Sequence, residues 1–163
     1  MNRCKIQNGS RTGNRLDRFD LAVIVLDTNV VSELMHTAPE PAVLRWFRGQ
    51  VSQELVVTAI TIAEILYGIE ILPAGKRRDA LHAGAQKMFG VVLADRTAPF
   101  DDSAARIFPV IVAERRRLGR PIEKMDAQIA AIARSRAATL ATRNIEDFED
   151  CGLGLVNPWQ SKS

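Results

Sequence analysis

Residues 21–27 read Leu-Ala-Val-Ile-Val-Leu-Asp, six apolar side chains followed directly by a carboxylate. An apolar run of this length, rich in β-branched residues, is typical of a central strand that is buried on both faces of a parallel sheet. Asp27 stands where that strand ends, and a helical pattern follows from it to Met35. The stretch therefore predicts an α/β fold with a polar group at the carboxyl edge of its sheet.

Outward from this stretch, segments with strand and helix periodicity alternate along the chain. We expect further strands at 55–58, 96–98, 139–142 and 155–157, and helices at 41–48, 61–72, 75–92, 102–118 and 123–136. The helices at 61–72 and 75–92 are expected to pair in antiparallel fashion. This order predicts a three-layer α/β/α sandwich around a mainly parallel sheet of about five strands.

The composition suits one globular domain, because 47% of the 163 residues are hydrophobic and 25% are charged. We expect that domain to span residues 21–163. Residues 1–20 hold isolated apolar side chains without periodicity, which predicts a disordered basic tail. An alternative is that Val23 is the true first residue, translated from a GTG start codon. The apolar runs are too short for a signal peptide or a membrane span, so we expect a cytoplasmic protein without a membrane partner.

The net charge of +3 is confined to the expected tail, which holds five basic and two acidic residues. The remaining 17 basic and 17 acidic residues balance, so an RNA-binding surface has to come from local clusters. Such clusters occur at 76–78 and at 115–120, with solvated helix faces as the alternative interpretation. We take Arg115, Arg116 and Arg143 as candidate RNA contacts.

Acidic side chains occur near the ends of the expected strands, and each also has a purely structural interpretation. Asp27 can cap the following helix. Glu64 follows Thr61 at the spacing of a capping box. Asp126 suits the first turn of a helix, although the alanine-rich helix around it packs closely and leaves a carboxylate in need of a partner.

Two further polar residues, Asn144 and Asp147, follow the fourth expected strand. Asn144 can simply shape a turn, and Asp147 can be surface charge in an acidic loop. Asp101 and Asp102 are explained by helix capping alone, and we leave them out of the site.

Together, these side chains place oxygen ligands at one end of four successive β-to-α junctions. Crowded carboxylates repel one another and stay ionised at neutral pH when a cation lies between them. The two cysteines and two histidines lack the spacing of a zinc motif, so oxygen must hold any metal. Mg²⁺ and Mn²⁺ suit such ligands, and they can activate a water for attack on a phosphodiester.

Five short motifs resemble, in order and spacing, those of the PIN-domain toxins of the VapC family and especially its FitB-like branch. They are Ile-Val-Leu-Asp-Thr-Asn-Val-Val-Ser at 24–32, Thr-Ile-Ala-Glu at 61–64, Met-Asp-Ala-Gln-Ile-Ala at 125–130, Leu-Ala-Thr-Arg-Asn at 140–144 and Asn-Pro-Trp at 157–159. The resemblance implies a PIN-like fold and a Mg²⁺- or Mn²⁺-dependent endoribonuclease, the toxin of a type II toxin–antitoxin system. It also implies a cognate antitoxin protein as partner and a homodimer.

Carried over by motif, the resemblance implies that Asp27 and Asp126 are the principal metal ligands and that Glu64 is the third acid. Some FitB-like members have Asp where this chain has Asn144. Asp147 is one candidate to supply the missing charge, and a site with a single metal is the alternative.

Two other functions remain open at this stage. A haloacid-dehalogenase-like phosphohydrolase would use Asp27 as a nucleophile, but it needs a second Asp at position 29, where this chain has Asn. A non-catalytic binding module would carry the same acids for structural reasons. Such a module would show no change in stability on addition of Mn²⁺.

Overall fold

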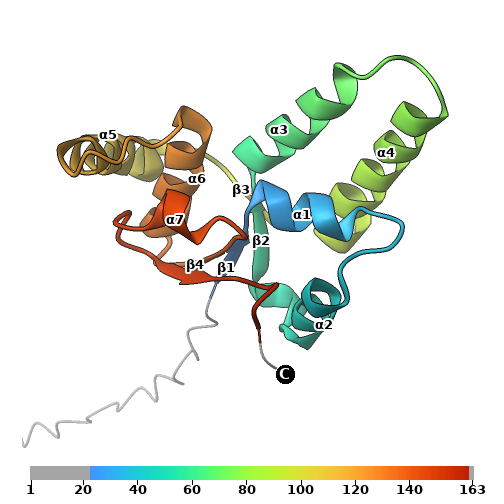
Figure 1. The fold of residues 1–163 in the computed structure, drawn as a ribbon, viewed down its shortest axis with the longest axis horizontal. Coiled ribbons are helices and arrows are strands. Elements are labelled where there is room, and N and C mark those ends of the chain that lie inside the picture. Colours follow the sequence, from blue (N-terminus) through green and yellow to red (C-terminus); the bar gives the residue numbers. More distant parts are fainter. Residues whose placement is uncertain (1–22, 162–163) are drawn as a thin grey trace, which may run out of the picture.

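Strand β1 (Ile24–Leu26) lies at the centre of a five-stranded sheet in the order β3-β2-β1-β4-β5 (Figure 1). The structure, a computed structural model, describes residues 23–161, so the expected tail at 1–20 lies outside the described part. All four pairs of neighbouring strands are parallel. The other strands are β2 (Leu55–Thr58), β3 (Thr97–Ala98), β4 (Thr139–Ala141) and β5 (Gly154–Val156).

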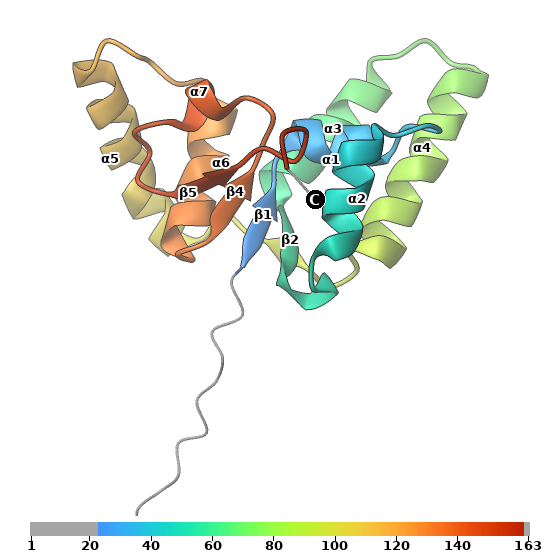
Figure 2. The same cartoon turned by 60° about the horizontal axis from the view of Figure 1, so that its bottom comes forward.

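Helices cover both faces of this sheet and complete the three layers that were predicted (Figure 2). One layer contains α1 (Thr28–Leu34), α2 (Pro41–Gly49), α3 (Ala59–Glu70) and α4 (Lys76–Lys87), which continues into a π-helical turn at Met88–Val92. The other layer contains α5 (Asp102–Arg117), α6 (Lys124–Ser135) and α7 (Ile145–Phe148). A short 3₁₀ helix, Ser52–Glu54, precedes β2. Both views show α3 and α4 side by side, as the predicted antiparallel pair.

Alternation of side chains along the strands divides the interior into two cores. Val25 is fully buried in the core under α5 and α6, whereas its neighbour Leu26 is fully buried in the core under α1 to α4. Helix α6 packs closely on the sheet because its central residues, Ala130 and Ala131, are small and fully buried. Within the apolar run that decided the fold, Val25 and Leu26 are therefore buried on opposite faces of the sheet, as predicted.

Two helix starts show how capping was assigned correctly in one place and wrongly in another. The Asp101 carboxylate accepts a hydrogen bond of 3.0 Å from the backbone N–H of Ala104, which confirms its predicted capping role. Helix α3 instead begins at Ala59, because the Thr58 hydroxyl accepts a hydrogen bond of 2.9 Å from the backbone N–H of Thr61. Thr61 is therefore inside the helix, and the capping-box interpretation of Glu64 is wrong.

The order of the strands reverses at β1. From β1 the chain moves to β2 and β3 on one side, and it later places β4 and β5 on the other side. In open parallel sheets, ligands bind at the point where the strand order reverses in this way. Along residues 23–161, no helix is both long enough and apolar enough to cross a lipid bilayer.

Candidate active site

Asp27 leaves the end of β1 and is only 4% exposed. Its backbone N–H donates to the carbonyl of Ala141, so the β1–β4 ladder fixes its position. One carboxylate oxygen, Oδ1, accepts a hydrogen bond from the backbone N–H of Thr28 at 2.7 Å. The other, Oδ2, accepts from the Asn29 amide and from the Thr142 hydroxyl, each at 2.7 Å. Burial raises the pKa of Asp27 and outweighs these hydrogen bonds, which lower it.

Glu64 approaches the same edge of the sheet from the second turn of α3. Its Oε2 atom accepts a hydrogen bond of 2.5 Å from the Thr28 hydroxyl. Thr28 therefore contacts both acids, through its backbone N–H at Asp27 and through its side chain at Glu64. The negative charge of Glu64 also contributes to the raised pKa of Asp27. The two carboxylates therefore act on each other directly.

Asp126 reaches the site by a different route from the one that the sequence suggested. It lies in the first turn of α6, which follows α5 through the loop at 118–123 and precedes β4. The expectation of four β-to-α junctions is therefore wrong for this residue. Its carboxylate is still within electrostatic reach of the others, because a helix that leads into a parallel strand begins at the carboxyl edge of the sheet.

Asp126 is surrounded by negative charge. Its pKa is raised to about 6, first by burial and then by the negative charges of Asp27, Glu64, Asp147 and Glu123. Glu123, at the N-cap of α6, played no part in the sequence prediction. An acid at the N-cap of a helix usually serves the helix dipole, so nothing in the sequence pattern marked it as part of the acidic group.

The fourth position is formed by α7 and the turn before it. Asn144 is the N-cap residue of α7, and its backbone N–H donates to the Thr142 hydroxyl at 3.0 Å. Asp147 lies in the single turn of α7 and is exposed, yet its charge acts on Asp126. Asn144 and Asp147 both line an open cavity of about 650 Å³.

Thr142 connects these parts, although the sequence interpretation gave it no role. The residue is fully buried, and its hydroxyl donates to Asp27 while it accepts from the Asn29 amide and the backbone N–H of Asn144. The sequence could not reveal this role, because it depends on partners from distant segments that meet only in the folded chain. Thr142 ties the carboxylate of β1 to the start of α7.

Arg143 lies at the rim of the site and is held there by the motif at 157–159. Its backbone N–H donates to the Asn29 side chain at 3.1 Å, and its carbonyl accepts from the Asn157 amide at 3.3 Å. The guanidinium carbon lies 5.3 Å from the centre of the Trp159 ring, within the range of a cation–π interaction. Arg143 is itself exposed, so its charge faces solvent beside the acids.

The arginine cluster at the end of α5 divides into buried and exposed members. Arg115 is 4% exposed and donates to the carbonyl of Glu149 at 2.7 Å. It therefore presents no free guanidinium for RNA, contrary to our expectation for this residue. Arg116, the next residue along α5, is exposed.

The chemistry of these donors fits a hard divalent cation. Among residues 23–161, no three His, Cys, Asp or Glu side chains lie close enough together to form a ready-made metal site. Mg²⁺ keeps several of its waters and contacts only one or two carboxylates directly, so wider spacing of the acids is compatible with it. Burial, and after it neighbouring negative charge, raises the pKa of Asp27 and of Asp126, and a bound cation would favour their ionised forms.

Comparison with known proteins gives matches over the same part of the chain. The model of the PIN domain family matches residues 24–152. The chain is 41% identical over 138 residues to VapC ribonuclease Y4jK of Sinorhizobium fredii, a match that covers 85% of this chain and 99% of that protein. It is 33% identical over 137 residues to Toxin FitB of Neisseria gonorrhoeae, with 84% and 99% covered. A solved structure of FitAB bound to an IR36 DNA fragment matches with a TM-score of 0.79 and 32% identity, over 86% of this chain and 99% of that chain.

Proposed function

The chain belongs to the PIN domain family, and from this membership we propose that its acidic site hydrolyses RNA with the help of bound Mg²⁺ or Mn²⁺. Its similarity to a VapC ribonuclease and to a FitB toxin makes it a divalent-metal-dependent endoribonuclease of the toxin–antitoxin type. What remains to be proposed is the site, the metal and the RNA substrate. We assign the site to Asp27, Glu64 and Asp126, with Asn144 and Asp147 at the fourth position.

One observation carries this assignment: four carboxylates act on the half-buried Asp126 and, together with burial, raise its pKa to about 6. Concentrating charge in this way destabilises the metal-free fold, and it is typical of acids that have a functional purpose. Capping does not provide that purpose, because Thr58 rather than Glu64 takes part in the cap of α3. A site for a divalent cation does.

The side chains divide the work according to how firmly each is held. Asp27, fixed by three hydrogen bonds, is the rigid anchor for the cation, and Asp126 is the second acid that faces it. Glu64 receives a single side-chain hydrogen bond from Thr28 and is suited to orient the attacking water. A bound divalent ion supplies activation of that water and stabilisation of the leaving oxygen. Arg143 is suited to contact a phosphate at the rim, and Arg116 is a more distant candidate contact.

The partners follow from the relatives and from the surface. The match to a FitAB structure supports a cognate antitoxin as the partner of this chain. We propose RNA as the substrate and a homodimer as the working assembly. The side chains of Tyr67 on α3 and of Ile71 at its C-cap are 66% and 64% exposed, and a second copy that covers them would support a dimer. Light scattering of the purified protein tests this assembly.

The test of the function is RNA cleavage by the purified chain with Mn²⁺, with Mg²⁺ and with a chelator. We expect the chelator to abolish cleavage and Asp126→Asn to reduce it to background. The matched control is Asp102→Asn, because Asp102 is an exposed acid in the first turn of α5, paired with Arg106 and remote from the site. Cleavage by Asp126→Asn at the wild-type rate would overturn the assignment. An unchanged melting temperature on addition of Mn²⁺ would instead favour a non-catalytic module.

A further inference from the structure

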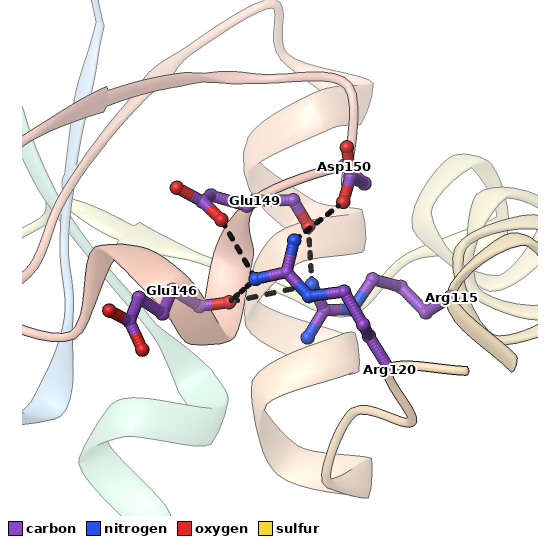
Figure 3. A network of polar contacts seen from close by, with 5 residues as sticks. All are labelled: Arg115, Arg120, Glu146, Glu149 and Asp150. Carbon is purple, nitrogen blue, oxygen red and sulfur yellow. Dashed lines mark hydrogen bonds and ion pairs between the residues drawn. The ribbon is translucent and has the colours of Figure 1, made fainter. Parts of the chain in front are cut away.

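Two guanidinium groups, those of Arg115 and Arg120, meet at the carboxyl end of α7 (Figure 3). Arg115 donates from Nη1 to the carbonyl oxygens of Glu149 and Glu146, at 2.7 and 3.4 Å. Arg120 forms ion pairs with the side chains of Glu149 and Asp150 at 2.8 and 3.0 Å, and it donates to the same Glu146 carbonyl at 3.4 Å. We call Arg115 and Arg120 the α7 clamp.

The end of α5 brings the two arginines together. Gly119 has φ +70°, a left-handed conformation that a residue with a side chain adopts at a cost. Its N–H donates to the carbonyl of Arg116, and the N–H of Arg120 donates to the carbonyl of Arg115, at 3.1 and 3.0 Å. This pair of bonds is a Schellman motif, which folds the chain back on the helix end. Arg120 therefore lies beside Arg115 instead of continuing outward.

Helix α7 depends on such contacts because it has only one turn. A single turn fixes several backbone dihedrals for very few hydrogen bonds, so it is unstable without tertiary support. The Glu149 N–H donates to the Ile145 carbonyl at 3.0 Å, but the carbonyl of Glu146 lies beyond the helical ladder. The clamp supplies donors for that carbonyl, and its positive charges lie at the helix end that favours cations. Phe148, fully enclosed in the core, is the second anchor of α7.

The opposite end of α7 carries the fourth position of the site. Asn144 caps that end, and Asp147 is within electrostatic reach of Asp126. One helical turn is about 5 Å long, so a shift at one end of α7 is transmitted to the other. Asn144, Glu146, Asp147 and Glu149 all line the same open cavity, so both ends of α7 border one space, although Asp27, Glu64 and Asp126 do not line it.

We propose that Arg115 and Arg120 are positioning residues for the metal site: by clamping the carboxyl end of α7, they fix Asn144 and Asp147 at the fourth position. This inference rests on the proposed function. It gives Arg115 and Arg120 the role of keeping the active site ordered. Contact with RNA is left to Arg116 and Arg143.

Charge alone predicts the opposite result, which makes the proposal testable. Removing a positive charge near an acidic site lowers repulsion toward an incoming cation, so Mn²⁺ would bind equally or more tightly. In Arg120→Ala, the freed Glu149 and Asp150 carboxylates would add to that attraction. If the clamp positions Asp147, the same substitution weakens binding instead. The sign of the change in affinity therefore separates positioning from electrostatics.

The first experiment is calorimetric titration of Mn²⁺ into wild type, Arg120→Ala and the control Arg117→Ala, all without RNA. Arg117 belongs to the same basic cluster and is exposed, so its removal is matched in charge. We expect Arg120→Ala to bind Mn²⁺ about tenfold more weakly, because residues that support metal ligands have effects of this size on affinity. The melting temperature should change only slightly. Arg117→Ala should bind as wild type does or slightly more tightly. Affinity in Arg120→Ala equal to that of Arg117→Ala would overturn the proposal.

Hydrogen exchange gives a readout without any metal. In Arg120→Ala, the backbone amides of Asp147 and Glu149 should exchange faster than in wild type, while amides in β1 and β4 keep their rates. Arg120→Lys keeps the charge but loses the two-pronged contact, so it should give intermediate exchange rates and intermediate affinity. Arg115→Lys provides the same comparison at the buried position, where truncation to alanine threatens the fold.

A double-variant cycle shows whether the clamp acts through Asp147. In an Asp147→Ala background, Arg120→Ala should produce no further loss of Mn²⁺ affinity. Losses that add fully in the double variant would overturn the proposal. Failure of the proposed function would look different, because wild type itself would then bind no Mn²⁺ and cut no RNA.

Discussion

The pKa values of Asp27 and Asp126 are both raised, but the neighbours of the two carboxyl groups differ. Asp27 is more deeply buried than Asp126, but three hydrogen-bond donors face it and lower its pKa. At Asp126, burial and the surrounding carboxylates all act in the same direction and raise the pKa to about 6. Asp126 is therefore the acid whose charge is least compensated before a cation binds.

The raised pKa of Asp126 gives the metal-free protein a specific dependence on pH. Between the unfolded value near 4 and the folded value near 6, the folded chain holds a proton that the unfolded chain has released. The contribution of Asp126 to the free energy of unfolding is therefore most favourable below this window and becomes less favourable as pH rises through it. Urea denaturation of wild type and Asp126→Asn with a chelator, from pH 4.5 to 7.5, isolates the effect. Above pH 6, Asp126→Asn should be more stable by about 1 kcal/mol, a figure reduced for solvent screening.

Both the pH range and the direction of this stability difference can be tested. Saturating Mg²⁺ should remove most of the advantage of Asp126→Asn, because the ion binds the ionised carboxylate of wild type. A difference between the two proteins that is constant across the whole range would show that the Asp126 carboxyl does not titrate there. An unfolded Asp126→Asn variant would show that the carboxylate serves the fold.

The fourth position yields a second prediction at the level of single side chains. Replacing Asn144 by Asp adds a carboxylate at the start of α7, so Mn²⁺ should bind more tightly and the metal-free protein should lose stability through repulsion. Replacing Asp147 by Ala should weaken Mn²⁺ binding. Calorimetric titration measures both. Unchanged affinity in both variants would mean that neither residue faces the metal.

Among the elements, strands were easier to predict from the sequence than the ends of helices. The expected range of β2 agrees with the structure residue for residue, because a short buried strand is a continuous apolar run between polar neighbours. Helix α3 starts two residues before the predicted start, because Thr58 and Thr61 are equally able to cap and only tertiary packing distinguishes them. Helix α7 was missed, since four residues are too few to show a helical period.

The capping of α3 gives a prediction at this scale. Thr58 and Thr61 are both fully buried, so replacing either by Ala removes the same methyl and hydroxyl groups. Only Thr58→Ala removes the acceptor for the first turn of α3, and it should cost about 1–2 kcal/mol more than Thr61→Ala. Urea denaturation of the two variants measures the difference. A larger loss in Thr61→Ala would restore the capping box that the sequence suggested.

Site residues that a strand end positions could be predicted from the sequence, whereas those that tertiary contacts position could not. Asp27 was placed correctly because a strand end fixes it, while Asp126 arrived from the start of α6 rather than from a strand. The burial of Arg115 was beyond the sequence, since three consecutive arginines at a helix end look like a solvated face. The residues that support the acids, Thr142 above all, become visible only when distant segments meet.

For the whole molecule, the separation of charge between tail and domain gives the last prediction. Residues 1–20 carry the entire excess of positive charge, so their removal should weaken non-specific RNA affinity at low salt and leave the cleavage rate nearly unchanged. RNA binding measured against salt concentration, for the full chain and for residues 21–163, tests this. The two curves should converge at high salt. Loss of cleavage at every salt concentration would place the tail within the folded domain.

The reversal of strand order at β1 has a consequence for how the molecule behaves as a whole. Asp27 and Glu64 belong to the strand and helix on one side of that point, whereas Asp126, Asn144 and Asp147 belong to the α5–α7 layer on the other. A cation shared by these groups would be a latch between the two halves, in addition to the hydrogen bonds from Thr142 and Arg143 and the packing of α3 against α6. Each tenfold rise of free ion above its dissociation constant tightens that latch by about 1.4 kcal/mol. If an open arrangement of the halves does not bind the ion, we expect their relative motion to decrease as the ion concentration rises, so that the enzyme is most rigid under the conditions in which it can cut.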